Sequence, residues 1–228
     1  MRTTIITPPA VAPVTWDMVR THLRLDELDP EVVDSEQTYC MDLAASAARV
    51  ATSVTRCALI ETQYEADLFP GEMSHRPDTG FRNCGCTGRP PILELDFPPL
   101  ISVDSIVLGE GTDATPLTEG TDYWILQTAD GKPTMPGTIL FRSGLFDPAC
   151  CCSCACYDLT QNWSSLHVLY TAGYGTDPQD VPADIRHWIL LRTGAGYEYR
   201  EESAEVRNIV TMPWADSLLT SERWFEFV

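Results

Sequence analysis

The sequence lacks any long apolar segment. No run of about 18 consecutive apolar residues, the minimum for a membrane-spanning helix, occurs among its 228 residues, although 44% of them are hydrophobic. The first residues, Met1–Pro9, also lack the long apolar core of a secretory signal peptide. These absences predict a protein that is made and kept in the cytoplasm, or in a particle assembled there, and that has no membrane partner.

Basic residues are also scarce. The chain carries 15 Lys and Arg against 33 Asp and Glu, a formal net charge of -18. Tight binding to nucleic acid depends on clustered Lys and Arg that release counterions from the phosphates, so a sequence-reading nucleic-acid binder is disfavoured. An acidic surface can still border DNA, because carboxylates repel phosphates and let a duplex pass without sticking. A solvated acidic surface is the simpler interpretation of the charge alone.

Motifs of catalysis are missing as well. The sequence contains no Gly-x-x-x-x-Gly-Lys-Ser/Thr, His-Glu-x-x-His, Gly-x-Ser-x-Gly or complete Gly-x-Gly-x-x-Gly pattern. The four histidines, His22, His75, His167 and His187, lie far apart without ligand spacing and are interpreted as structural or surface residues. Carboxylates are so numerous that no acid and base pair can be assigned. We therefore predict that the chain is not an enzyme and has no cofactor beyond a possible structural zinc.

Cysteine is the one abundant reactive residue. Seven of the nine cysteines form two short clusters: Cys84 and Cys86, then Cys150, Cys151, Cys152, Cys154 and Cys156. If the two loops meet, they offer enough thiolates for a tetrahedral zinc site, although their spacing is not the usual repeated Cys-x-x-Cys pair. Disulfides formed after cell lysis and unlinked thiols remain the alternatives, because the cytoplasm is reducing.

Hydrophobic periodicity predicts helices at both ends of the chain. The Pro- and Thr-rich residues 1–14 are predicted to form an extended arm that can lie on a neighbour. Thr15 is a predicted N-cap for a helix to about Leu25, and Asp29-Pro30 starts a second helix. A third helix begins near Pro182. The predicted apolar side of the second helix contains Val33, Glu36, Cys40, Leu43, Ala47, Val50 and Val54, and that of the third contains Ile185, Trp188, Ile189 and Arg192.

Between these helices the pattern changes to period two and to β-forming residues, with Gly- and Pro-rich turns. Six strands are predicted, at residues 62–66, 92–95, 103–108, 123–126, 138–141 and 167–170. The predicted fold class is therefore α+β, with a helical bundle core of two N-terminal helices and a C-terminal helix, and an inserted antiparallel β-sheet module. The predicted boundaries are an arm at 1–14, a main domain at 15–202 with helices at 15–57 and 181–201 and sheet at 60–172, and a tail at 203–228.

Several segments together resemble the head-tail connector family of tailed bacteriophages. They run from about Val14 to Glu201, and their order and spacing are more specific than any single one. The matching segments are Thr21–Asp26, Ala48–Ile60 with Gln63-Tyr64, Pro98–Ile106, Val168–Gly175, Val181–Ile185 and Tyr197–Glu201. The strongest stretch also has a direct physical interpretation. Gly173 and Gly175 permit a sharp turn after a strand, and Pro182 with Asp184 starts a helix.

The resemblance implies a structural virion protein, an adaptor at the virion neck. Such a protein assembles as a homododecameric ring beneath the portal protein, extends the DNA channel for transient, non-specific passage of DNA, and presents a docking surface to a stopper or tail-completion protein. By this analogy the aromatic C-terminus, with Trp224, Phe225, Phe227 and Val228, is the candidate portal-binding segment. The Cys-rich loops at 71–89 and 144–162 depart from the family pattern.

Two other functions remain open at this point. One is a different neck or tail-end protein, a stopper or tail terminator; these are generally dominated by sheet, whereas this chain commits a long Ala-rich helix to its core. The other is a metal-binding or redox protein that uses the cysteine loops.

Overall fold

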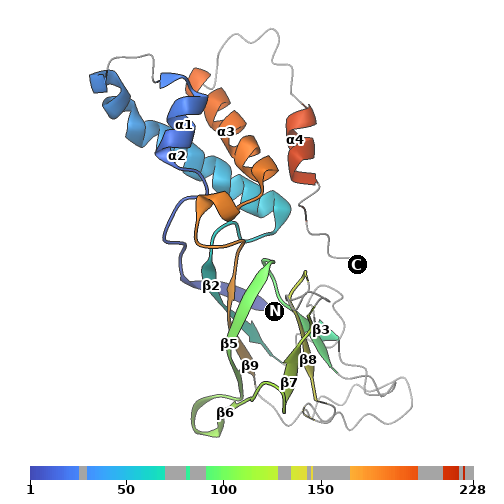
Figure 1. Cartoon of the computed structure of the whole chain (residues 1–228). Coiled ribbons are helices and arrows are strands. Elements are labelled where there is room, and N and C mark those ends of the chain that lie inside the picture. Colours follow the sequence, from blue (N-terminus) through green and yellow to red (C-terminus); the bar gives the residue numbers. More distant parts are fainter. Residues whose placement is uncertain are drawn as a thin grey trace. The chain divides into compact units, whose positions relative to one another are not determined.

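The computed structural model describes residues 1–25, 30–69, 81–82, 91–127, 135–142, 145, 165–199, 213–220 and 223 (Figure 1). The chain forms two compact units. The sheet unit contains Met1–Pro8 and Glu61–Gly173, and the helical unit contains Pro9–Ile60 and the described residues after Gly173. The predicted α+β class with antiparallel pairing is confirmed. Among the described residues, no helix has the length and apolar character needed to cross a membrane.

The helical unit begins with two helices that start where the sequence predicts. Helix α1 spans Trp16–His22, and Thr15 caps it by accepting a hydrogen bond from the Met18 backbone N–H at 3.3 Å. Helix α2 spans Pro30–Thr55 and is the longest helix described. A proline suits its first position because the N–H that proline lacks would have no partner within the helix there.

The buried side of α2 differs in part from the predicted one. Its buried positions are Val33, Cys40, Ala44, Ala47, Ala48, Ala51 and Thr55. Val50 and Val54, which were predicted on the apolar side, are 46% and 38% exposed. The side of α2 that packs against α3 is centred on Ala44 and Ala51 and not on the larger valines, because the small alanine side chains let α3 approach closely.

Helices α3, Ala183–Glu198, and α4, Pro213–Thr220, complete the described part of this unit. Ile185, Trp188, Ile189 and Thr193 of α3 are buried. Thr193, and not Arg192 as predicted, lies on the buried side of α3. The Thr193 hydroxyl donates a hydrogen bond to the Ile189 carbonyl at 2.8 Å. Helix α4 was not predicted, because eight residues give too few repeats for a helical period to be recognised.

The sheet unit contains two antiparallel sheets, whereas the sequence predicted one. The first has the strand order β1-β2-β9-β5-β6 and the second β3-β4-β8-β7. The strands of the first are β1 (Arg2–Thr7), β2 (Thr62–Leu68), β9 (Leu166–Ala172), β5 (Leu100–Leu108) and β6 (Thr115–Pro116). Those of the second are β3 (Phe81–Arg82), β4 (Ile92–Glu94), β8 (Thr138–Phe141) and β7 (Tyr123–Ile125). All six predicted strands are present.

The N-terminal residues do not form a separate arm. Arg2–Thr7 is extended, as predicted, but it pairs antiparallel with β2 of its own chain. The Thr3 hydroxyl donates to the Asp96 carboxylate at 2.7 Å and helps to fix this edge strand. Five consecutive β-branched residues, from Thr3 to Thr7, favour a strand, and this preference outweighs the Pro-rich character of the residues that follow.

Aromatic side chains fill part of the interior of the sheet unit. Tyr64 of β2 stacks on Tyr170 of β9 and on Phe97, with ring centroids 5.5 and 5.0 Å apart. The Tyr170 hydroxyl donates to the Asp96 carbonyl at 2.9 Å. Burial raises the pKa of Tyr170 far above its ordinary value, and the nearby Asp96 and Tyr64 raise this pKa further. Tyr170 therefore acts as a neutral hydrogen-bond donor within the core.

Candidate functional site

Two of the predicted sites lie outside the described residues. These are the C-terminal segment with Trp224, Phe225, Phe227 and Val228, and the seven clustered cysteines, Cys84, Cys86, Cys150, Cys151, Cys152, Cys154 and Cys156. Cys40 and Cys57, the cysteines within the described residues, are buried. The metal or disulfide chemistry of the clustered cysteines and the portal-binding role of the C-terminal segment therefore stay predictions.

The glycine motif lies where the chain passes from the sheet unit to the helical unit. Gly173 follows β9 with a φ of 142°, and its N–H donates to the Pro99 carbonyl at 2.9 Å. Gly175 has a φ of 158°, and a Cβ atom there would overlap the Asp180 side chain. Both positions therefore favour glycine, because other residues rarely adopt this backbone conformation.

Asp180 belongs to a short 3₁₀ helix, η5, which spans Pro178–Asp180 and has Asp177 as its N-cap. The Asp177 carboxylate accepts from the Gln179 N–H at 2.8 Å, and the Asp180 carboxylate accepts from the Asp177 N–H at 3.1 Å. Helix α3 follows, with Pro182 at its N-cap position and Asp184 in its first turn. The carboxylates of Asp177 and Asp180 are both used to hold backbone N–H groups, so the motif has a structural role.

The outward-facing side chains of the first sheet form its outer face. Along β2 and β9, buried residues alternate with half-exposed ones, so that one face of each strand is buried. The half-exposed set comprises Gln63, Glu65 and Asp67 of β2 and His167, Leu169 and Thr171 of β9. In the register of these strands Asp67 is directly opposite His167, which brings together residues that are 100 positions apart in sequence.

One polar group on the outer face is centred on Asp104 of β5. Its carboxylate accepts hydrogen bonds from Gln63 at 2.8 Å, from Ser102 at 2.9 Å and from Thr171 at 3.0 Å. These bonds join three neighbouring strands, β2, β9 and β5. The Asp104 carboxylate is saturated by neutral donors, so we assign it a role in holding the strands together.

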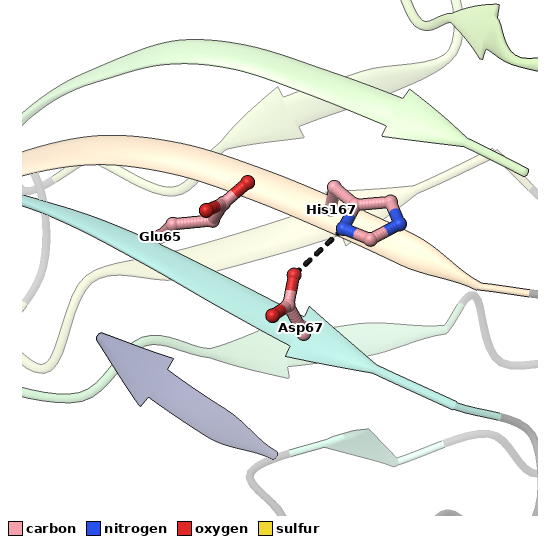
Figure 2. A group of neighbouring side chains, drawn as sticks. All are labelled: Glu65, Asp67 and His167. Carbon is pink, nitrogen blue, oxygen red and sulfur yellow. Dashed lines mark hydrogen bonds and ion pairs between the residues drawn. The ribbon is translucent and has the colours of Figure 1, made fainter. Parts of the chain in front are cut away.

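A second group, which we call the Asp67–His167 cluster, contains Glu65, Asp67 and His167 (Figure 2). The His167 Nδ1 lies 2.6 Å from the Asp67 carboxylate, and its Nε2 lies 3.0 Å from the Ser165 hydroxyl. The Glu110 carboxylate is 3.9 Å from the same Nε2. The imidazole is therefore held at both ring nitrogens and is surrounded by three carboxylates.

The order Asp67, His167, Ser165 matches the connectivity of a hydrolase triad, in which a carboxylate orients an imidazole that activates a hydroxyl. Ser165 is 0% exposed. A nucleophile must reach its substrate, so the buried Ser165 hydroxyl is assigned to fixing the His167 ring and not to attacking a substrate.

The sequence did not reveal this cluster, because the four histidines lie far apart along the chain without ligand spacing. Part of the signal was present, since Glu65 lies on the predicted strand 62–66, and Asp67, one residue beyond it, would point to the same face if that strand continued. The position of His167 opposite them depends on the pairing of β2 with β9, which sequence spacing does not reveal.

The helical unit presents an exposed apolar stripe on α2, which we define as Tyr39, Val50 and Val54. Their exposed fractions are 36%, 46% and 38%. Residues 11 and then 4 positions apart on a helix lie on one side of it, since each interval is close to a whole number of turns. This stripe lies on the same helix as the buried alanines but outside the packed side.

Two neighbouring histidines in the helical unit are expected to make its folding less stable in acid. The rings of His22 in α1 and His187 in α3 lie 6.4 Å apart. Burial, and then the neighbouring His187, lower the pKa of His22 below its ordinary value of 6.5. The unfolded chain therefore binds a proton at His22 more readily than the folded chain does. This group has no effect on stability above about pH 7 and decreases it as the pH falls below about 6.5.

We expect the thermal midpoint of the helical unit to decrease between about pH 7.5 and about pH 5.5, and to decrease less in a His22→Gln variant. Circular dichroism of the helical signal measures both. Equal decreases in the two proteins would show that His22 does not contribute, and a His187→Gln variant, which removes the second cause of the pKa shift, is expected to fall between them.

Comparison with known proteins gives matches at the level of structure. No family model and no curated protein matches the sequence. A chain in the neck of an empty GTA particle, computed with C6 symmetry, matches with a TM-score of 0.68 and 17% identity, covering 100% of this chain and 98% of that one. A chain in the virion of a native gene transfer agent (GTA) particle gives a TM-score of 0.67 at 17% identity, again with 100% and 98% coverage.

A third match is a chain in the neck of a native GTA particle, computed with C12 symmetry, with a TM-score of 0.59, 16% identity and the same coverage of 100% and 98%. At this level of identity the likeness establishes the fold. The chain thus has the fold of a chain from the neck of a virus-like particle, and the resemblance to neck connectors is confirmed at that level.

Proposed function

We propose that this chain is a structural subunit of a head-tail connector, the adaptor ring between the portal and the next tier of the neck. The observation that carries the proposal is the match in fold to neck chains over the whole of this chain and 98% of theirs. Both units are included in that match. The proposed role is structural.

The adaptor is favoured over a stopper or tail terminator by the helical unit. Helix α2 has 26 residues and α3 has 16. Stoppers and terminators, by the same family resemblance, are dominated by sheet. A ring of helical units beneath a portal is therefore the better fit.

A second copy of the chain is the proposed occupant of the stripe on α2. The neighbouring structures are necks described with C6 and C12 symmetry, which supports self-assembly into a ring. The net charge of -18 makes subunits repel one another, so an apolar contact is needed to offset the repulsion. Val50 and Val54 provide such a contact at positions that are exposed in the single chain.

The remaining partners follow from the adaptor role. The segment with Trp224, Phe225, Phe227 and Val228 is proposed to bind the portal, and the opposite end of the ring to dock the stopper or tail-completion protein. Carboxylates facing the channel would repel phosphates and allow DNA to pass without being retained. The site of action is then the virion neck, after assembly in the host cytoplasm.

The proposal is tested by native mass spectrometry of the purified chain alone and mixed with its portal protein. We expect the chain to add to the portal in the portal's own dodecameric stoichiometry, and the assembly to be favoured by higher ionic strength because salt screens the repulsion between acidic subunits. Metal content is measured on the same sample. Absence of portal binding together with stoichiometric zinc would overturn the proposal in favour of a cysteine-based metal protein.

A further inference from the structure

The Asp67–His167 cluster has the composition and spacing of a metal-binding group. Glu65, Asp67 and His167 each offer one ligand atom, and these atoms all lie within 4.8 Å of one another. Zinc and similar divalent ions bind imidazole nitrogen and carboxylate oxygen at about 2.0–2.2 Å. Ligands around one such ion are therefore separated by up to about 4.4 Å, so only small side-chain rotations are needed to reach this geometry.

The Asp67–His167 cluster is built on regular secondary structure. All three residues lie on paired strands, β2 and β9, near the middle of the five-stranded sheet. Figure 2 shows Glu65 and Asp67 on one strand facing the His167 ring on the next. Sites built on strands keep their geometry better than sites on loops, so little ordering is required when an ion binds.

The Ser165 hydroxyl holds the imidazole ring in a position that allows ligation through Nδ1. When His167 Nε2–H donates to the Ser165 oxygen at 3.0 Å, the neutral ring carries its lone pair on Nδ1, which faces Asp67 at 2.6 Å. Metal-bound histidines commonly use their second nitrogen in this way. In the other tautomer Nδ1–H donates to Asp67 and Nε2 accepts from the Ser165 hydroxyl, so binding of an ion at Nδ1 selects the tautomer in which Nε2 carries the proton.

The local charge also favours a cation. Glu65, Asp67 and Glu110 contribute three carboxylates around a single imidazole. On the adjacent strand, Arg2 of β1 is paired in register with Asp67, and it is exposed. In the part of the chain that the structure describes, three carboxylates thus surround the imidazole with one arginine beside them in register.

We propose that Glu65, Asp67 and His167 bind a divalent first-row transition ion, such as Mn²⁺ or Zn²⁺, through two carboxylate oxygens and His167 Nδ1, with water completing the coordination. Because the ligating Nδ1 must be unprotonated, the neutral ring carries its proton on Nε2 when the ion is bound. A mixed nitrogen and oxygen set suits these ions, whereas Mg²⁺ and Ca²⁺ prefer sites made of oxygen alone. This proposal goes beyond the neck function and does not depend on it.

The test uses Mn²⁺ and the purified chain without portal protein. Mn²⁺ is chosen because thiolates favour softer ions, so the clustered cysteines compete little. Free Mn²⁺ is measured by electron paramagnetic resonance, and broadening of backbone amide signals by bound Mn²⁺ locates the site. We expect one site, with broadening centred on residues near 67 and 167, weaker binding at acidic pH, and no displacement by excess Mg²⁺.

The variants are Asp67→Asn, Glu65→Gln and His167→Gln, and each is expected to weaken Mn²⁺ binding by more than about tenfold. The matched control is Glu61→Gln, which removes one carboxylate from an exposed residue directly before β2 and outside the cluster. Thermal melts establish that each variant is folded. If one variant does not fold, the other two still decide the result.

Either of two results would overturn the proposal. One is that the wild-type chain does not bind Mn²⁺ at this position. The other is that Glu61→Gln weakens binding as much as the cluster variants do, which would indicate a diffuse attraction of cations to an acidic surface. A failure to bind the portal would leave this measurement unaffected, so the two proposals can fail separately.

Discussion

Replacing Trp188 with alanine is expected to lower the free energy of unfolding of the helical unit by about 3–5 kcal/mol. Trp188 is 2% exposed and belongs to the core shared by α1, α2, α3 and α4. Removing its ring takes away a large buried apolar surface and leaves a cavity that the surrounding helices fill only in part. Urea unfolding followed by far-UV circular dichroism measures the effect, because the helices dominate that signal.

Trp188 also holds α4 through a polar contact, and this contact provides a control. Its indole Nε1–H donates to Asp216 of α4 at 3.2 Å, and the Arg192 guanidinium lies 5.2 Å from its ring centroid. A Trp188→Phe variant keeps most of the apolar burial but loses the indole donor, so its expected cost is about 1–2 kcal/mol. Equal losses for alanine and phenylalanine would contradict the assignment of the stability to ring burial.

The second large effect concerns ring assembly. In the double variant Val50→Glu and Val54→Glu, a neighbouring subunit would have to bury two carboxylates against an apolar surface. An uncompensated buried charge costs roughly 3–5 kcal/mol, and the cost recurs at each contact around the ring. We therefore expect the variant to form no ring on the portal in native mass spectrometry, while its circular dichroism stays that of the wild type, because both positions are exposed in the single chain.

A matched control adds the same charge elsewhere on α2. Thr38 and Ala45 are exposed positions outside the stripe. The double variant Thr38→Glu and Ala45→Glu raises the net negative charge equally, and we expect it to assemble. Loss of the ring in both double variants would point to general charge repulsion, and normal assembly of the Val50 and Val54 variant would remove the stripe from the interface.

Local signals in the sequence were sufficient for most elements. The Thr15 cap, the proline at the start of α2 and the first turn of α3 act within a few residues, so their effects can be inferred without a fold. Alternation along β2 and β9 predicted strands with one buried face, and the structure has that pattern. The class, α+β with antiparallel pairing, followed from the order of these elements.

Which side of a helix is buried was harder to predict where several of its positions were hydrophobic. On α2 the pattern of valine, leucine and alanine is compatible with more than one packed side, and the prediction included Val50 and Val54. Packing against α3 determines which side of α2 is buried, since the smallest residues permit the closest approach of two helices. Helix α4 and the two-residue strands β3 and β6 are too short to carry a period and were missed for that reason.

The sequence by itself determined the three longest helical regions, six of the strands, and the resemblance to neck connectors that the fold bears out. Tertiary structure alone decided that Arg2–Thr7 joins β2, that the strands divide between two sheets, and that Asp67 faces His167. The physical reason is the range of the interactions. Capping and periodicity are set by neighbours along the chain, whereas strand register brings together residues far apart in sequence, and the Asp67–His167 cluster exists only once that register is formed.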